Sequence, residues 1–105
     1  MAATDTKAPA TSGTKYLDAV KLLALHPVNG LTPGEIAKDL GVSPAWVSQN
    51  LPHLEAKGFA ARDPETGRWR AGVLFMQISN HAADELRRAL GKITELQQRY
   101  SARPY

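Results

Sequence analysis

The segment from Leu31 to Phe59, LTPGEIAKDLGVSPAWVSQNLPHLEAKGF, constrains the fold of this chain more than any other. Its residues 32–35, Thr-Pro-Gly-Glu, have the order of a helix N-cap, a proline at the first helical position and a capping-box glutamate. Gly41 suits a left-handed residue that ends this helix, and Ser43 suits the cap of another. The segment therefore predicts two short helices joined by a tight turn.

Apolar residues fall on one side of each predicted helix, as expected for a shared core. They are Ile36, Ala37, Leu40, Val47, Leu51 and Leu54. Residues 44–57 then take the recognition position of a helix-turn-helix; a purely structural αα-hairpin is the competing interpretation. Pro52 lies inside the second helix and predicts a kink there or, alternatively, a break into 44–51 and 52–57.

The flanking segments extend this motif on both sides. Residues 15–26 carry apolar side chains at helical spacing, and Pro27 ends that predicted helix. Residues 30–32 suit a one-bridge strand. Residues 59–72, FAARDPETGRWRAG, place a Pro/Gly turn between two short alternating stretches and predict a β-hairpin, which directly after a helix-turn-helix is a wing. We expect an apolar side formed by Phe59, Ala61, Trp69 and Ala71, with Arg62, Arg68 and Arg70 toward solvent.

Residues 73–100 contain no proline and predict one long helix, or two with a bend near 79–80. The dense apolar residues of 73–78 should cover the winged domain. Beyond them, side chains at steps of three and four form a narrow seam on a protruding helix. This seam consists of Ala83, Leu86, Leu90, Ile93, Gln97 and Tyr100. It predicts a homodimer; a helix folded back onto its own domain is the alternative.

The fold class predicted is mainly α (α+β), a winged helix-turn-helix with a long C-terminal helix. A chain of 105 residues is enough for one such domain. The predicted organisation is a disordered arm (1–14), the winged domain (15–72), the C-terminal helix (73–100) and a tail (101–105).

The composition of the chain limits the cellular compartment and the kinds of chemistry that can be expected of it. The absence of cysteine excludes disulfides and thiolate metal sites. No apolar run is long enough for a bilayer, and the N-terminus lacks the apolar core of a secretion signal. We expect a cytoplasmic, nucleoid-associated prokaryotic protein without a membrane contact. No nucleophile–base pair, phosphate-cradling loop or metal cluster is visible, so neither an enzyme nor a cofactor is predicted.

The net charge of +3 is compatible with nucleic acid and lies in the second half of the chain. The base-reading candidates on the exposed face of the second helix are Ser43, Ala45, Trp46, Ser48, Gln49 and His53. Trp46 is either exposed or, as we favour, half-buried. No Lys or Arg lies between Pro44 and Ala56. The candidate backbone contacts are therefore Lys38, Lys57, Arg62, Arg68 and Arg70, and Lys7 or Lys15 is a weaker minor-groove candidate.

The sequence of residues 54–72, LEAKGFAARDPETGRWRAG, resembles the recognition-helix end and wing of IclR-type winged helix-turn-helix domains. Those domains often carry L-E-x-x-G-[FY]-x-x-[RK]-D-x-x-[TS]-G-[RK]-[YW]-x-x-G. The resemblance implies DNA binding. Full IclR regulators also carry a large C-terminal effector-binding domain; this sequence has none, so no small-molecule effector is expected. Asn50 and Pro52 depart from the family pattern. The run SPAWVSQNL also resembles ParB/KorB-type plasmid proteins, which lack this wing.

These observations support one main hypothesis and two alternatives. The main hypothesis is a small homodimeric repressor that binds double-stranded DNA in a sequence-specific way. The first alternative is a protein-interaction adaptor for assembly or plasmid or phage partition, which uses the winged helix as a scaffold. Non-specific nucleoid packing is disfavoured by the modest charge.

Overall fold

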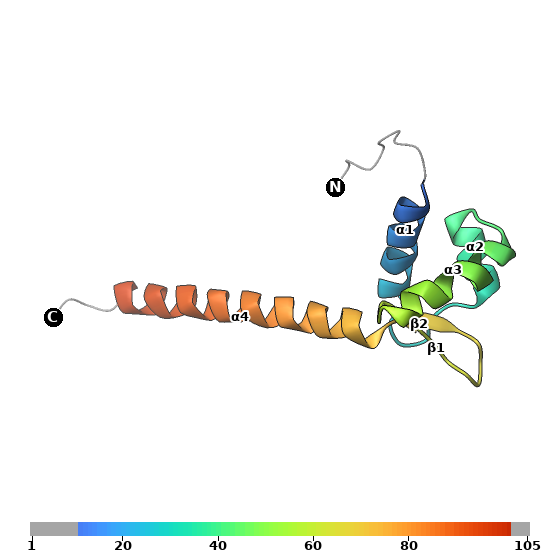
Figure 1. The fold of residues 1–105 in the computed structure, drawn as a ribbon. Coiled ribbons are helices and arrows are strands. Elements are labelled where there is room, and N and C mark those ends of the chain that lie inside the picture. Colours follow the sequence, from blue (N-terminus) through green and yellow to red (C-terminus); the bar gives the residue numbers. More distant parts are fainter. Residues whose placement is uncertain (1–10, 102–105) are drawn as a thin grey trace.

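The computed structural model describes residues 11–101, which fold into a winged domain and one long projecting helix (Figure 1). The elements in chain order are α1 (Ser12–Ala24), α2 (Pro33–Leu40), α3 (Pro44–Ala56), β1 (Ala60–Arg62), β2 (Trp69–Ala71) and α4 (Val73–Ser101). The predicted fold class, mainly α with a small sheet and a long C-terminal helix, is confirmed. Residues 1–10 and 102–105, which include Lys7 and most of the expected arm and tail, lie outside the described residues.

Helix α1 begins three residues earlier than the sequence pattern indicated. Thr11 is its N-cap: the Thr14 backbone N–H donates to Thr11 Oγ1 at 3.2 Å, and the Thr11 N–H donates to Thr14 Oγ1 at 2.7 Å. This reciprocal pair is a capping box in which a threonine stands where glutamate or glutamine is usual. The expected boundary at residue 15 is therefore wrong, and the helix ends at Ala24, ahead of Pro27.

The predicted capping of α2 and α3 is confirmed. The Glu35 N–H donates to Thr32 Oγ1 at 3.1 Å, and the Thr32 N–H donates to Glu35 Oε1 at 2.8 Å. Gly41 ends α2 in the left-handed region (φ 68°), and Ser43 Oγ accepts from the Trp46 N–H at 3.0 Å. Helix α3 continues through Pro52, so the alternative of two separate segments is wrong.

The wing is an antiparallel pair whose register differs by one residue from the expectation. Ala60 pairs with Ala71, Ala61 with Arg70, and Arg62 with Trp69. Opposed residues share a face, so Ala60, not Ala61 or Phe59, lies on the buried side with Trp69 and Ala71. The hairpin loop sets this register, because the Asp63 N–H donates to the Arg68 carbonyl at 2.8 Å.

The wing also pairs with the connection between α1 and α2. The Leu31 N–H donates to the Trp69 carbonyl at 2.7 Å, and the Trp69 N–H donates to the Leu31 carbonyl at 2.8 Å. This isolated bridge confirms the one-bridge strand predicted at residues 30–32. It attaches the base of the wing to the segment that starts α2.

The core lies where α1, α2, α3 and the base of the wing meet. Its buried members are Ala19, Leu23, Leu31, Ile36, Ala37, Val47, Leu51, Ala60 and Trp69. In α1 the buried pair is Ala19 and Leu23, which are one helical turn apart. Leu17 and Leu25, two apolar residues of the same segment, are 64% and 75% exposed and do not belong to the core.

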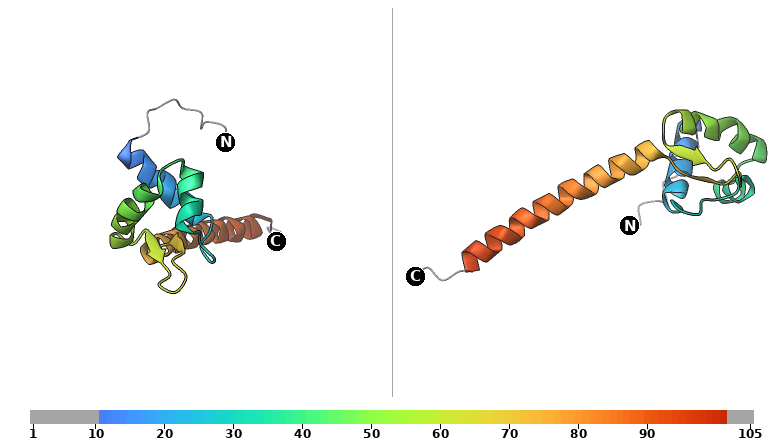
Figure 2. Two further views of the ribbon diagram at one scale, coloured as in Figure 1. Left: turned by 90° about the vertical axis from the view of Figure 1, so that its right-hand side faces the viewer. Right: turned by 90° about the horizontal axis from the view of Figure 1, so that it is seen from below.

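Helix α4 is one continuous helix of 29 residues that extends away from the winged domain (Figures 1 and 2). The radius of gyration of the chain reflects this extension, because it is 19.6 Å, whereas a compact chain of this length would have about 13 Å. Neither the bend near 79–80 nor the folded-back alternative is present. The expectation that residues 73–78 cover the domain is largely wrong, since Val73 and Ile78 are 69% and 52% exposed. Only Phe75 and Met76 of this segment are half-buried. The Phe75 ring packs edge-on against the Phe59 ring, with 6.2 Å between the ring centroids.

Candidate nucleic-acid interface

The outer face of α3 presents a row of exposed side chains. Ala45, Gln49 and His53 follow one another at intervals of four residues, so they lie along one line of the helix, and all three are exposed. Ser48 is exposed beside this row, with its hydroxyl donating to the Ala45 carbonyl at 3.1 Å. Within residues 11–101 the side chains of Gln49 and His53 make no hydrogen bond, which leaves their polar atoms available to a ligand.

Trp46 is half-buried, as favoured from the sequence. It packs against the core, and its ring lies 5.8 Å from that of Tyr16 on α1. The side chain therefore anchors the start of α3 to α1. Its place among the candidate base-reading residues is correspondingly weaker than that of Gln49.

A groove of about 330 Å³ lies between α3 and the wing. It is lined by Pro33, Val47, Ser48, Pro52, Glu55, Arg62 and Trp69. The groove therefore brings together two candidate contacts from separate parts of the sequence, Ser48 of the helix and Arg62 of the wing. Glu55 lines the same groove and would oppose a phosphate at its own end.

The three wing arginines differ in what they contact. Arg62 and Arg70 are exposed. Arg68 instead donates from Nε to the Asn29 carbonyl at 2.9 Å and from Nη2 to the Gly30 carbonyl at 3.2 Å. The expectation that Arg68 points to solvent like the other two is therefore wrong. Its guanidinium joins the wing to the loop between α1 and α2.

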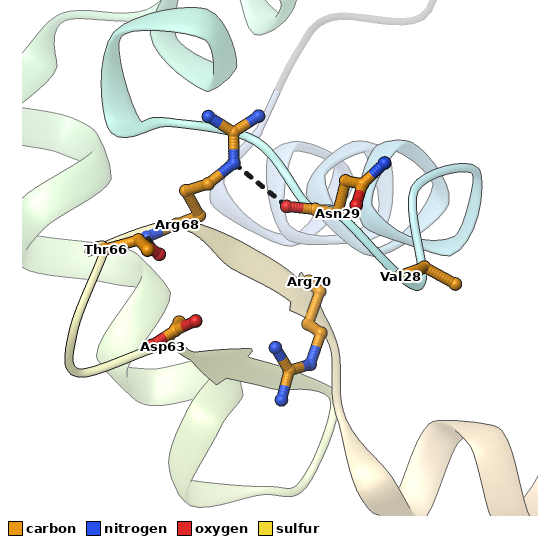
Figure 3. Close-up of a pocket in the computed structure, with 6 residues that line it drawn as sticks. All are labelled: Val28, Asn29, Asp63, Thr66, Arg68 and Arg70. Carbon is orange, nitrogen blue, oxygen red and sulfur yellow. Dashed lines mark hydrogen bonds between the residues drawn. The ribbon is translucent and has the colours of Figure 1, made fainter.

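Figure 3 shows this difference on the outer side of the wing. Arg68 points toward Asn29, whereas Arg70 points away from it. The two arginines line an open pocket of about 410 Å³ together with Val28, Asn29, Asp63 and Thr66. Of these two arginines, only Arg68 donates its side-chain hydrogen bonds to backbone carbonyls within the described residues.

No protein-family model and no curated protein matches this chain. Solved structures do match. The structure of an IclR transcriptional regulator from Alicyclobacillus acidocaldarius is 30% identical with a TM-score of 0.62, over 73% of this chain and 31% of that one. The described residues therefore have the fold of a winged helix-turn-helix domain that is similar to part of an IclR transcriptional regulator.

A second solved structure gives the same result. HmgR of Pseudomonas aeruginosa is 27% identical with a TM-score of 0.55, over 82% of this chain and 35% of that one. The chain spans about a third of the length of each of these two structures. The likeness therefore concerns only part of each of those two proteins.

Asn50, one departure from the IclR-type pattern, has a structural role. The Tyr16 hydroxyl donates to Asn50 Oδ1 at 2.7 Å, and Asn50 Nδ2 donates to the Trp46 carbonyl at 2.8 Å. These bonds link α1 to the middle of α3, which is the helix with the exposed polar row. Sequence reasoning missed this pair, since nothing local connects two residues 34 positions apart.

Two carboxyl groups of the winged domain have lowered pKa values. The pKa of Glu35 is lowered by the hydrogen bond from the Thr32 N–H, and the Arg68 guanidinium, 3.7 Å away, lowers it further. The pKa of Asp63 is lowered by the hydrogen bond from the Glu65 N–H at 2.8 Å. Both groups are held as carboxylates by the turns that they stabilise.

The two candidate lysines lie at helix ends. Lys38 is exposed in the last turn of α2, and Lys57 is exposed at the C-cap of α3. Lys15, the weaker candidate, lies within α1 and its Nζ donates to the Leu40 carbonyl at 3.3 Å. It therefore holds the end of α2 and is a poorer candidate for a contact in the minor groove.

Within residues 11–101 no three His, Asp or Glu side chains are grouped so that they could ligate a metal ion. The helices of this range are each too short or too polar to cross a bilayer.

Proposed function

We propose that this chain binds double-stranded DNA in a sequence-specific way and acts as a small homodimeric transcriptional repressor. Helix α3 enters the major groove, and the wing of residues 59–72 lies on the backbone or in the minor groove. Promoter occupation is the mode of action. The observation that carries the proposal is the exposed row of Ala45, Gln49 and His53 on α3, beside a groove shared with Arg62.

The chemistry of this row supports base reading. A glutamine amide pairs in two-pronged fashion with adenine, and an alanine methyl packs against a thymine methyl. Gln49 and Ala45 therefore favour A·T pairs in the half-site. Ser43 and Ser48 supply hydroxyls for phosphate oxygens or base edges at the helix start.

The affinity comes from outside α3, because the helix has no Lys or Arg. Arg62 and Arg70 of the wing, with Lys38 and Lys57, are the cations available for phosphates. A monomer with so few phosphate contacts binds weakly, and a homodimer doubles their number. Self-association through α4 is therefore part of the proposal.

The experiment is selection of bound sequences from a random DNA pool, followed by fluorescence anisotropy at two salt concentrations. We expect an enriched half-site and an affinity that falls steeply as salt rises. Gln49→Ala should reduce the preference for the selected site by about 1–3 kcal/mol. Gln77→Ala, on the exposed side of α4, is the matched control and should bind like the wild type. No DNA binding at low salt would refute the proposal.

Two features would favour the alternative function, a protein-interaction adaptor: a recognition helix without Lys or Arg and an exposed Trp46. The half-buried position of Trp46 against Tyr16 removes one of these two supports. We therefore retain DNA binding as the function that the geometry supports best.

A further inference from the structure

The exposed apolar stripe of α4 is wider than the narrow seam expected from the sequence. Leu86, Leu90 and Ile93 are 66%, 62% and 52% exposed, and Leu96, outside that seam, is 42% exposed. On an ideal helix Leu96 lies on the same flank as Ala82 and Ala89, each seven residues from the next. Together these residues widen the stripe to about 140° of the helix surface.

The two flanks of the stripe differ in chemistry. With Ala83, Leu90 and Gln97 at heptad positions a, and Leu86, Ile93 and Tyr100 at positions d, the g positions are Ala82, Ala89 and Leu96. The e positions on the other flank are Arg87, Thr94 and Ser101, and Arg87 is paired there with Asp84. One flank is therefore apolar and the other polar.

This asymmetry distinguishes the two ways in which a second copy can pair. In a parallel pair with twofold symmetry, each g flank lies beside the partner's e flank, so Leu96 would lie beside Ser101 of the other copy. In an antiparallel pair, the same symmetry sets g beside g and e beside e. The apolar flanks then meet, so that Leu96 of one copy faces the apolar g flank of the other.

The contacts within one copy favour the same arrangement. Phe75 and Met76, at the start of the stripe, are half-buried, and Phe75 lies against Phe59 of the same chain. Figure 1 shows the winged domain at this end of α4 alone. In a parallel pair both winged domains would lie at the same end of the paired helices, where they would compete for space. An antiparallel pair separates them.

We propose that two copies of this chain pair antiparallel through the a, d and g face of α4, with their winged domains at opposite ends. Registers that set Leu90 against Leu86 or Ile93 of the other copy place the two Val73 residues roughly 45–55 Å apart along the helix axis, at 1.5 Å per residue. The proposal deepens the homodimer of the proposed function. It requires no DNA, so it fails or holds independently of DNA binding.

Spin-label distances test the orientation, and the cysteine-free chain needs no background substitution. Val73→Cys and Gln98→Cys are labelled separately, and the label–label distance is measured in the full chain by pulsed dipolar spectroscopy. The antiparallel pair predicts a distance at position 73 that exceeds the distance at position 98 by about 15–35 Å, at 1.5 Å per residue. Equal distances at the two positions would show a parallel pair and overturn the proposal.

Two further variants in the Val73-labelled protein test the interface. Leu90→Glu places a charge in the centre of the stripe and should abolish the dipolar signal. Gln98→Glu introduces the same side chain away from the stripe and should keep it. If the labelled Val73→Cys chain without a second substitution gave no dipolar signal at position 73 and the labelled Gln98→Cys chain gave none at position 98, the protein would be monomeric, and that result also overturns the proposal.

Discussion

The Tyr16 hydroxyl donates a 2.7 Å hydrogen bond to Asn50 Oδ1 and so connects the first helix to the middle of α3. Asn50 is held at its other end, because its Nδ2 donates to the Trp46 carbonyl one turn earlier. Trp46 in turn lies against the Tyr16 ring. The three side chains form one unit that sets the position of α3 on the domain.

Loss of the Tyr16 hydroxyl should therefore reduce stability. We expect Tyr16→Phe to lower the free energy of unfolding by about 0.5–1.5 kcal/mol, the usual net value of one hydrogen bond. Urea denaturation followed by Trp46 and Trp69 fluorescence measures this change. Gln98→Ala, at an exposed residue of α4 outside the a, d and g face, is the control and should be neutral. Equal stabilities of the two variants would argue against a stabilising bond.

The local signals of the sequence predicted much of this fold. The Thr32 capping box, the left-handed Gly41 and the Ser43 cap are each specified within a few residues, and each is confirmed. The wing register was missed, because Ala60 and Ala61 are equally apolar and only the hairpin loop decides which is buried. Local patterns could therefore identify the elements but not this alignment.

The hydrogen-bond partners of the candidate contact residues depend on tertiary structure. Arg68, Arg62 and Arg70 are equivalent in the sequence of the wing, and only the approach of the α1–α2 loop gives Arg68 its carbonyl partners. Asn50 likewise gains its role only when α1 crosses α3. Such contacts join residues far apart in sequence, which periodicity and capping rules do not relate.

The two neighbouring arginines of the wing should respond differently to truncation. Arg68→Ala removes two hydrogen bonds from a half-exposed guanidinium and should lower the free energy of unfolding by about 1–2 kcal/mol. Arg70→Ala should change stability by less than about 0.5 kcal/mol and weaken binding to all DNA sequences alike. Denaturation and anisotropy on both variants separate the effects. Wild-type DNA affinity for Arg70→Ala would exclude it as a phosphate contact.

Stability should fall in acid partly through Glu35. Its pKa is below the ordinary value of 4.5 because the Thr32 N–H donates to the carboxylate, with a smaller effect from Arg68. A lowered pKa in the folded state contributes stability above the ordinary value, and this contribution is lost as the pH falls through the folded-state value. Urea denaturation at neutral and acidic pH should show a smaller acid loss for Glu35→Gln than for the wild type. If the wild type and Glu35→Gln lost the same stability in acid, Glu35 would not contribute to the pH dependence.

Substitution by alanine should have opposite effects on stability at two glycines. A Cβ at Gly72 would collide with the Gly58 carbonyl and the Ala60 nitrogen, both backbone atoms that cannot move aside. We expect Gly72→Ala to lower the free energy of unfolding by about 1–3 kcal/mol. Gly91, with nothing within 4 Å of its added Cβ, lies inside α4, and Gly91→Ala should stabilise that helix by about 0.5–1 kcal/mol. Thermal melts of the two variants test both signs, and a destabilised Gly91→Ala would point to a contact at that residue.

The antiparallel pairing of α4 predicts the spacing of the DNA half-sites. The roughly 45–55 Å between the two Val73 residues exceeds the ~34 Å of one DNA turn, so adjacent half-sites cannot both be occupied. Half-sites on one side of the duplex then lie about two turns apart, near 21 base pairs centre to centre. Anisotropy on palindromes spaced by about one, one and a half and two turns measures this. Tightest binding at one turn would leave DNA recognition intact and reject the antiparallel dimer as the form that binds.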